Sequence, residues 1–578
     1  MSFLGVEASL TGRRWIGPGD DVMRASEALQ QQSQLPPAVC QVLARRGVTT
    51  HDAEGFLAPS LRDLLPDPRS LKDMTKAAKR FISALQNCER IAIFADYDVD
   101  GGSSAALLMS WLRDMGHTAT LYVPDRIDEG YGPNEDAMAR LAADHDLIVC
   151  VDCGTLSHEP IAAARGAEVI VLDHHLGGEA LPPALAVVNP NRQDESGESG
   201  HLCAAGVVFL MLVEVRRQLR EDGHSSPDLM ALLDLVALAT VADVAPLVGV
   251  NRAFVRQGLK VMARRNRVGL TALADAAGLD TAPTAYHLGF VLGPRVNAGG
   301  RIGAADLGAR LLATDDPHEA AALSERLESL NKERRDIEAA VRAAATAQAE
   351  ERGFDRGLVW AAGANWHPGV VGIVASRLKE TSGRPSIVIG IENGVGKGSG
   401  RSISGIDLGQ PIQRLTAEGL LLKGGGHKMA AGLTVDEAKI EAAMERLNDL
   451  LEKQGAHERG AADLRVDGLL MPQAATVEMV ELIENAGPYG ASAPAPRYVF
   501  ADMAIRFAKR VGENHLKVSF GGDAASMDAI CFNAFDGPLG PAIEDHGGKH
   551  FHLAGRLDIN IWRGRHSVQL RLEDAALA

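Results

Sequence analysis

The sequence lacks the features that mark a secreted or membrane-bound protein. Only 6 of its 578 residues are cysteine, and they are scattered along the chain, which excludes a disulfide framework. No apolar run approaches the roughly 18 residues of a membrane helix, and the first residues lack the apolar segment of a signal peptide. We therefore expect a cytoplasmic protein with no membrane partner.

An excess of positive charge is also missing. There are 59 Lys and Arg residues against 75 Asp and Glu, a net charge of −16, which argues against nonspecific binding to nucleic acid. The negative net charge does not exclude a local basic groove, because phosphate contacts need only a few well-placed cations. Aromatic residues make up only 4% of the chain. Tyr131, Trp366 and Tyr489 are candidates for stacking on bases, although packing is the simpler explanation for each.

Continuous apolar segments alternate with helical patterns from about Arg90 onward. The predicted strands lie in "RIAIFADYD", "TATLYVP", "LIVCVDCG" and "EVIVLDHH". Apolar strands separated by helices are typical of a parallel sheet covered on both faces. In such sheets ligands bind at the carboxyl ends of the strands.

The rest of the chain predicts further units. Residues 200–310 look mostly helical, and a helix from Pro317 to about Arg352 keeps an apolar seam of period three to four, as a stiff spacer or as a core helix of one domain. Strands and helices then alternate again, and short strands with turns near the C-terminus indicate a small β-barrel. The fold class is α/β, with expected parts at 1–70 (N-terminal helical region), 71–312 (parallel-sheet domain), 313–352 (connecting helix), 353–455 (second, smaller α/β domain) and 464–578 (β-barrel).

Polar side chains collect where the strands of the first predicted sheet end. If these strands are adjacent and parallel, the side chains meet at one edge of the sheet. Carboxylates packed within a few Å of one another raise each other's pKa and destabilise the fold unless cations neutralise them. The residues are Asp96, Asp98 and Asp100 after the first strand, Asp152 after the third, and Asp173, His174 and His175 after the fourth.

This donor set favours Mn²⁺ or Mg²⁺, which prefer oxygen ligands with few imidazoles. Two ions about 3.5 to 4 Å apart, bridged by a carboxylate, would activate water for phosphoryl chemistry. Asp152 is the natural bridge, and Asp98 and Asp100 can face different ions. Asp243, in "ATVADVAPL", supplies a further carboxylate that would otherwise be costly among Ala and Val. The helix start directly after Asp100, at residues 101–104, offers backbone N–H groups to an anion.

Eight ordered motifs identify a resemblance. They are "DYDVDGG", "VPDRIDEGYG", "VDCG", "LDHH", "ATVADVAPL", "GPRVNAGGRIG", "HPGVVGIVASRL" and "GGGHKMAAG". In this order they resemble the RecJ-type single-stranded-DNA-specific exonucleases of the DHH phosphoesterase superfamily, over about residues 70 to 440 and on into the C-terminal β unit. The resemblance implies a DHH catalytic domain at 71–312, a DHHA1-like substrate-binding domain at 353–455 and an OB-like nucleic-acid-binding barrel at 464–578.

The resemblance also implies an activity, metals and partners. We expect a 5′-to-3′ exonuclease that uses Mn²⁺ or Mg²⁺ to release nucleoside 5′-monophosphates from single-stranded DNA, in recombination and repair. Family context implies work beside a helicase and a single-strand-binding protein, and we expect a monomer. The implied metal ligands are Asp98, Asp100, Asp152, His174 and Asp243, with Asp96 as an auxiliary ligand and His175 at the scissile phosphate.

Further positions match the family's DNA contacts. They are Arg126, Arg295, Asn297 and Arg301 for DNA phosphates, Arg401 and Ser402 in "GKGSGRSIS" for a terminal phosphate, and His427 on a glycine turn. In the barrel, Arg563 and Arg565 are backbone contacts or the solvated tip of a hairpin. One position differs from the family's motif: where relatives commonly carry a metal-ligating His, this chain has Phe94. One metal site is therefore expected to be short of a ligand, or completed by Asp96 or water.

Two alternatives differ in class. A phosphodiesterase on short oligonucleotides or cyclic dinucleotides, or a pyrophosphatase, would share the catalytic motifs, but such relatives are usually much shorter and lack the C-terminal β unit. A non-catalytic scaffold relative would keep the fold and lose the metals. The joint retention of the six predicted catalytic carboxylates and histidines argues against that alternative.

Overall fold

The computed structural model describes residues 2–126, 129–456, 463–522, 525–562 and 564–578. The chain forms two compact units, Leu65–Gly460 and a second in which Met1–Leu64 packs with Ala461–Ala578. No helix within the described ranges is long and apolar enough to cross a membrane. Arg563, one of the two candidate DNA contacts in the barrel, lies outside these ranges.

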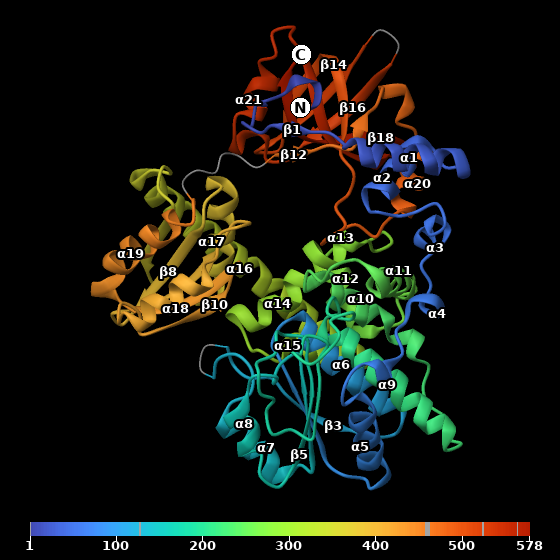
Figure 1. Cartoon of the computed structure of the whole chain (residues 1–578), viewed down its shortest axis with the longest axis vertical. Helices are drawn as coiled ribbons and strands as arrows, with labels where there is room; N and C mark the ends of the chain where they lie inside the picture. Colours follow the sequence, from blue (N-terminus) through green and yellow to red (C-terminus); the bar gives the residue numbers. More distant parts are fainter. Residues whose placement is uncertain (1, 127–128, 457–462, 523–524, 563) are drawn as a thin grey trace. The chain divides into compact units, whose positions relative to one another are not determined.

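The larger unit begins with the predicted parallel sheet, in the strand order β3-β2-β4-β5-β6. Helices α7 and α8 lie on one side of the sheet, and α5, α6 and α9 lie on the other (Figure 1). All residues of β2 and β4 are buried, which is why these strands read as continuous apolar runs. The short strand β6 was not predicted. The elements are α5 (Met74–Gln86), β2 (Ile91–Ala95), α6 (Val99–Asp114), β3 (Ala119–Tyr122), α7 (Glu135–Asp144), β4 (Leu147–Val151), α8 (His158–Ala163), β5 (Glu168–Leu172), β6 (Ala186–Val188) and α9 (Ala204–Glu221).

A helical region follows the sheet, as predicted. Its elements are α10 (Leu233–Ala242), α11 (Gly249–Met262), α12 (Val268–Ala276), α13 (Ala285–His287), η4 (Leu288–Leu292), α14 (Gly293–Ile302), α15 (Leu307–Ala313) and α16 (Pro317–Arg352). The long helix α16 has the predicted bounds, and Asp316 caps its N-terminus. It packs on α12, α14 and α15 and also on α17 and β7, so it contributes to the core of both blocks that it joins.

The second block of the larger unit is a mixed sheet in the order β10-β11-β9-β8-β7, in which only β7 and β8 pair in parallel. Its elements are β7 (Val359–Ala364), α17 (Pro368–Ser382), β8 (Ser386–Glu392), β9 (Val395–Arg401), α18 (Gly409–Ala417), β10 (Lys423–His427), β11 (Ala430–Asp436) and α19 (Ile440–Glu452). The run "GKGSGR" is strand β9, and "KGGGH" is strand β10. The expectation of a glycine turn carrying His427 and Lys428 is corrected: the glycines lie in strand β10, and Lys428 and Met429 form the turn after His427, which pairs with Ala430.

The smaller unit is a closed five-stranded barrel with additional N-terminal elements. Strands β14, β15, β16, β18 and β17 pair in sequence, and β17 pairs with β14 to close the barrel. The barrel elements are β12 (Leu464–Arg465), β13 (Gly468–Leu469), α20 (Val477–Asn485), β14 (Tyr498–Val511), β15 (His515–Gly521), β16 (Ser526–Cys531), α21 (Leu539–Glu544), β17 (His550–Trp562) and β18 (Arg565–Leu577). The N-terminal elements are β1 (Trp15–Ile16), α1 (Asp20–Gln32), α2 (Pro37–Arg45), α3 (Ala53–Leu57) and α4 (Leu61–Leu64).

Residues far apart in sequence hold this unit together. Strand β1 pairs in parallel with β12. The indole N–H of Trp15 donates a hydrogen bond of 2.9 Å to the buried carboxylate of Asp574, near the C-terminus. The helices before residue 65 therefore share a core with the barrel.

Candidate functional site

The carboxyl ends of β2, β4 and β5 lie side by side. Their last residues pair with one another in register, so Asp96, Asp152 and Asp173 each follow at the same edge of the sheet. This confirms that the strands are adjacent and parallel. It also explains why the polar residues after three separate strands come together.

Three overlapping groups of side chains have ligand atoms within 4.8 Å of one another: Asp152, His174 and His175; Asp100, His174 and Asp243; and Asp96, Asp98 and Asp152. The Nε2 atom of His174 lies 3.2 Å from Asp152 Oδ1, 3.6 Å from Asp100 Oδ2 and 3.7 Å from Asp243 Oδ2. Asp152 and His174 each belong to two groups. The structure thus brings together the six predicted ligands, Asp96 included, and places Asp152 between two sets.

Asp98 and Asp100 lie at the start of helix α6, a difference from their expected place at a strand end. Asp98 is the N-cap and accepts hydrogen bonds from the N–H groups of Asp100 (2.8 Å) and Gly101 (3.2 Å). These donors are therefore used within the protein, and the predicted anion site at 101–104 is not supported. Gly101 serves close packing instead, since a Cβ there would lie 2.3 Å from the carbonyl oxygen of Asp96.

Asp100 is fully buried, and the N-terminus of α9 holds it in place. The backbone N–H groups of Ala204 and Ala205 donate hydrogen bonds of 2.6 and 2.8 Å to its carboxylate. Burial raises the pKa of Asp100, and the charge of Asp98 adds to this, while His174 and the α9 N–H groups oppose it. Sequence reasoning could not have found this support, because 104 residues separate the partners.

The carboxylates of the site are costly to ionise together. Burial, followed by the charges of neighbouring carboxylates, raises the pKa of Asp96 and Asp152 well above the ordinary value. The same causes raise the pKa of Asp243 to about 8. Within the described part of the chain, no hydrogen bond reaches the buried Oδ1 of Asp96. Such a cluster fits divalent cations, which would neutralise the carboxylates and bind the open oxygen.

Phe94 offers no ligand atom. Its side chain is buried in the core below the site, with its ring centroid 5.3 Å from that of Tyr122. The group of Asp96, Asp98 and Asp152 nevertheless provides three carboxylates without it. Asp96 can therefore take the place of the ligand that Phe94 does not supply, which is one of the outcomes expected for this metal site.

Asp173 fixes the backbone at His174 and His175 and orients the ring of His175. Its Oδ1 accepts hydrogen bonds from the backbone N–H of His174 (2.7 Å) and of His175 (3.1 Å), and lies 2.8 Å from Nδ1 of His175. Burial alone would raise the pKa of Asp173, but these bonds hold it well below its ordinary value. Burial likewise opposes protonation of His175, yet the hydrogen bond and charge of Asp173 raise the pKa of His175 to about 9. In the metal-free protein this pKa keeps His175 largely protonated at neutral pH.

Tyr131 also positions His175. Its hydroxyl lies 3.0 Å from Nε2 of His175 and donates a hydrogen bond of 3.2 Å to the backbone carbonyl of Asp152. Tyr131 thus has a role besides the base stacking for which the sequence suggested it. Of the other two candidates, Trp366 packs against Gly363 and Gly390, and Tyr489 donates its hydroxyl to the carbonyl of Ile483.

A cavity of about 220 Å³ adjoins the carboxylates and is lined by both acidic and basic side chains. Asp96, Tyr97, Asp98, Arg126, Tyr131, His175, Asn297 and Arg301 line it. The guanidinium of Arg126 lies 5.3 Å from the ring centroid of Tyr97. Asn297 Oδ1 accepts the N–H of Val99, the first residue of α6. Tyr97 was not predicted, although its position between two candidate ligands was a signal.

Basic side chains gather beside this cavity. Arg301 donates a hydrogen bond of 3.0 Å to the carbonyl of Gly369, and burial together with the like charges of Arg126 and Arg334 lowers its pKa to about 10. Burial and Arg126 also lower the pKa of Arg401, which donates to the hydroxyl of Ser399 at 3.0 Å. Arginines that repel one another in a buried place favour an anion between them.

Arg401 does not itself line the cavity, and three further predicted DNA contacts are not brought to it. Arg295 is paired with Glu328 and donates a second hydrogen bond to the carbonyl of Val291. Ser402 is buried, and its hydroxyl donates to the carbonyl of Ile406. His427 lies at the end of an exposed strand. Ser399 stands beside Arg401 in place of Ser402, which the two-residue period of strand β9 could have indicated.

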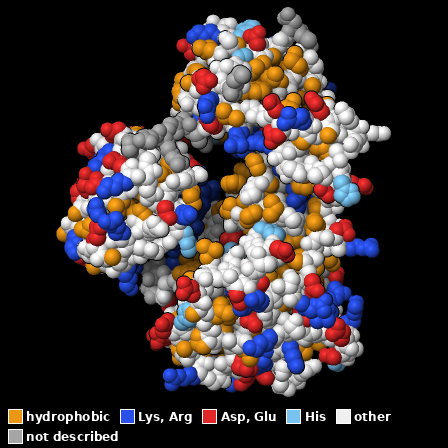
Figure 2. All heavy atoms as spheres, viewed as in Figure 1, with side chains coloured by type: hydrophobic (Ala, Val, Ile, Leu, Met, Phe, Trp, Pro, Cys, Tyr) orange, Lys and Arg blue, Asp and Glu red, His pale blue; other side chains and the backbone are white. Residues whose placement is uncertain are grey.

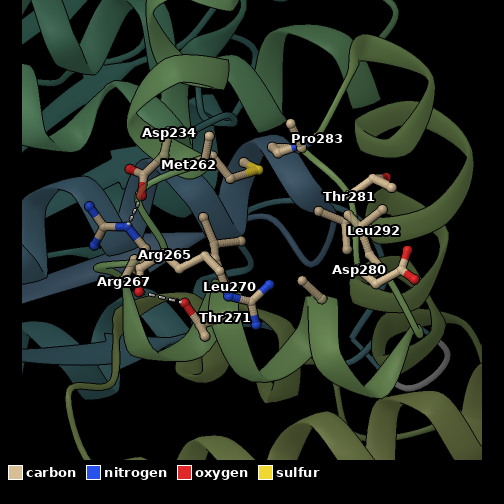
Figure 3. A pocket seen from close by; sticks show the side chains of 14 residues that line it. Asp234, Met262, Arg265, Arg267, Leu270, Thr271, Asp280, Thr281, Pro283 and Leu292 are labelled. Atoms are coloured by element: carbon tan, nitrogen blue, oxygen red, sulfur yellow. Dashed lines mark hydrogen bonds and ion pairs between the residues drawn. The ribbon is translucent and has the colours of Figure 1, made fainter. Parts of the chain in front are cut away.

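A second cavity, of about 230 Å³, lies in the helical region between α10 and α12 (Figure 3). Three of its charged lining residues take part in ion pairs: Arg267 bonds to Asp234 at 2.8 Å, and Arg265 pairs with Asp275. None of the candidate ligands lines it. We assign it no role in the chemistry.

The parallel sheet, the carboxylate and histidine cluster and the basic cavity together define a phosphoesterase of the DHH class. Residues 90–240 match the DHH family, N-terminal domain, residues 355–453 the DHHA1 domain, and residues 466–574 the RecJ OB domain.

The chain belongs to the RecJ family. It is 39% identical over 573 residues to the single-stranded-DNA-specific exonuclease RecJ of Dickeya dadantii, covering 95% of this chain and 98% of that one. Identity to RecJ of Escherichia coli is 37% over 571 residues, covering 95% and 97%. Among solved structures, RecJ of Thermus thermophilus in complex with Mn²⁺ matches with a TM-score of 0.80 at 30% identity, over 97% of this chain and 79% of that one. The Mg²⁺ complex of that protein matches with a TM-score of 0.75 at 29% identity, over 98% and 78%.

Proposed function

We propose that this protein is a single-stranded-DNA-specific exonuclease that degrades DNA from the 5′ end and releases nucleoside 5′-monophosphates, in DNA recombination and repair. The observation that carries the proposal is the cluster in which Asp152 and His174 are shared between ligand groups, next to a cavity lined by arginines. The names of the relatives support the choice of single-stranded DNA as the substrate.

Mn²⁺ or Mg²⁺ fits the donor set. Asp100, His174 and Asp243 would hold one ion, and Asp96, Asp98 and Asp152 the other, with Asp152 between them. Bound there, the ions would activate a water molecule and neutralise charge on the phosphate. The RecJ structures that contain Mn²⁺ and Mg²⁺ support this assignment.

The chain's own groups bind and orient the phosphate. Asp173 keeps His175 protonated and fixes its ring, so that the positive charge of the imidazolium attracts an oxygen of the scissile phosphate. Tyr131, whose hydroxyl lies beside Nε2, limits the rotation of the ring. Arg126, Asn297 and Arg301 line the same cavity and hold this phosphate or its neighbour.

A second phosphate position supports the proposed direction of degradation. Arg401, with Ser399 beside it, lies close enough to Arg126 for the two charges to interact. A terminal 5′-phosphate held there would leave the first internucleotide bond at the carboxylates. Each cycle would then release one nucleoside 5′-monophosphate.

The parts of the chain divide this work. We assign catalysis to residues 71–312, connection to 313–352, closure over the substrate to 353–455 and further binding of DNA to 464–578, with a helical region at 1–70. A helicase that opens duplexes and a single-strand-binding protein are the expected partners of a monomer in the cytoplasm.

Digestion of labelled DNA tests the proposal. Single-stranded and duplex oligonucleotides carrying a label at the 5′ or the 3′ end are incubated with Mn²⁺, with Mg²⁺ and with EDTA. We expect labelled mononucleotide to appear first from the 5′-labelled single strand and only with metal. Asp152→Ala should abolish turnover and leave DNA binding largely intact. Release from the 3′ end, or activity retained in EDTA, would refute the proposal.

A further inference from the structure

A stacked pair of aromatic rings lies exposed near the candidate site. The ring centroids of Tyr286, in α13, and Phe290, in η4, are 5.1 Å apart, and their planes differ by 25°. The exposed fractions are 51% for Tyr286 and 71% for Phe290. Figure 2 shows hydrophobic side chains gathered where Figure 1 labels α13. Since large aromatic side chains are normally buried, the exposure of Phe290 indicates a surface that binds a partner.

The pair shares one helical stretch with Asn297 and Arg301, which line the cavity beside the carboxylates. Helices α13, η4 and α14 follow one another without a break over residues 285–302. Asn297 and Arg301 are four residues apart in α14, which places them near one face of that helix. Phe290 precedes Asn297 by seven residues in the same helical stretch. A rise of 1.5 Å per residue puts Phe290 roughly 10 Å from Asn297 along the helix axis.

The turn that carries Phe290 is a π-helix, a form often found at functional sites. Gly289, within it, allows a close approach to α10, because a Cβ there would lie 3.3 Å from a methyl group of Val241. Val241 is two residues before Asp243, and the following Val244 is 69% exposed. The apolar surface therefore borders a candidate metal ligand.

We propose that Tyr286 and Phe290 stack on nucleobases of the single strand whose phosphates lie in the basic cavity. This inference rests on the proposed function, and it extends the substrate-binding site. Every base presents a flat face, so stacking on an aromatic ring tolerates any sequence. In a duplex these faces are covered by neighbouring base pairs, so the aromatic pair also favours single strands over duplex DNA.

Substitution of Phe290 tests the proposal with the full-length protein and Mn²⁺. For a long single-stranded oligonucleotide, Phe290→Ala should raise KM roughly 5- to 150-fold, the range expected for one lost stacked base, with little change in kcat. Phe290→Trp should retain the wild-type KM, whereas Phe290→Leu, which keeps an apolar side chain, should behave like Phe290→Ala. The matched control is Phe354→Ala, an exposed aromatic residue of the same unit, which should change nothing.

Abasic substrates identify the stacked nucleotide. In a series of oligonucleotides with one abasic site at successive positions from the 5′ end, one position should raise KM for the wild type and leave KM for Phe290→Ala unchanged. An unchanged KM in both Phe290→Ala and Phe290→Leu would overturn the inference and point to a protein as the occupant of the patch. Absence of metal-dependent hydrolysis by the wild type would instead overturn the proposed function.

Discussion

At the scale of single residues, the site depends on side chains whose role is to orient others. The motifs indicated which carboxylates and histidines would meet, because strand ends in a parallel sheet share one edge. They did not show that Asp98 caps a helix or that Arg295 is committed to Glu328. These depend on side-chain geometry that no spacing in the sequence encodes.

The Asp173–His175 pair yields a prediction about pH. The pKa of His175 is raised to about 9 by Asp173, so the wild type keeps this histidine protonated from pH 6 to above pH 8. Asp173→Asn removes the negative charge, and the pKa of His175 falls toward or below its ordinary value of 6.5. We expect a loss of about 10- to 100-fold in activity, typical of groups that orient metal ligands, and a loss that grows as pH rises.

Initial rates on single-stranded DNA at constant ionic strength, measured from pH 6 to pH 8.5, test this. Asp194→Asn is a suitable control, since that exposed carboxylate pairs with Lys72 and Arg192 and contacts none of the candidate ligands. A ratio of variant to wild-type rate that stays flat with pH would contradict a charged His175.

At the scale of elements, the ends of β2, β4 and β5 concentrate negative charge. The pKa values of Asp96, Asp100, Asp152 and Asp243 are raised above the ordinary 3.8, that of Asp243 to about 8. Without metal, the folded state therefore binds more protons than the unfolded state at pH values between about 4 and about 8. The stability of the metal-free protein should therefore fall as pH rises from about 4 to about 8.

Metal binding should reverse this trend. Thermal unfolding in EDTA and in Mn²⁺ is the measurement, and we expect Mn²⁺ to raise Tm more at pH 8 than at pH 6, because protons compete with the ion for the same carboxylates. In Asp152→Asn, the rise in Tm caused by Mn²⁺ should differ less between pH 8 and pH 6 than it does in the wild type. A larger rise in Tm at pH 6 would show that these carboxylates do not hold the ion.

The glycine-rich strands show what a local pattern cannot reveal. The strands of the parallel sheet and the bounds of α16 could be predicted, since apolar periodicity marks them, but β9 and β10 contain too many glycines to resemble strands. In β9 the glycines are required by packing: a Cβ at Gly400 would lie 2.6 Å from a methyl group of Leu408. Gly425, in β10, has open space at the same position.

Alanine at these two glycines should therefore have different effects. Gly400→Ala should lower the free energy of unfolding by about 1 to 3 kcal/mol through overpacking. Gly425→Ala should change it by less than about 0.5 kcal/mol. Urea unfolding followed by circular dichroism measures both, and equal effects would mean that the two strands are not packed as described.

At the scale of the whole molecule, the chain combines a net charge of −16 with a concentrated basic site. The local site could be predicted from motifs. The joining of Met1–Leu64 with Ala461–Ala578 could not, because the pairing of β1 with β12 links segments some 450 residues apart and leaves no periodic signal. Binding of DNA should accordingly depend on a few arginines rather than on the overall field of the protein.

Salt dependence separates these arginines from the aromatic pair. For single strands, each neutralised phosphate contributes about −0.7 to the slope of log K against log salt concentration. Binding is measured by fluorescence anisotropy of a labelled oligonucleotide, with Asp152→Ala present in every protein to prevent cleavage. Adding Arg126→Ala should reduce the magnitude of the slope by about 0.7. Phe290→Leu should weaken binding at every salt concentration and leave the slope unchanged, because stacking releases no counterions. If both substitutions altered the slope equally, Phe290 would act through the phosphates and not through the bases.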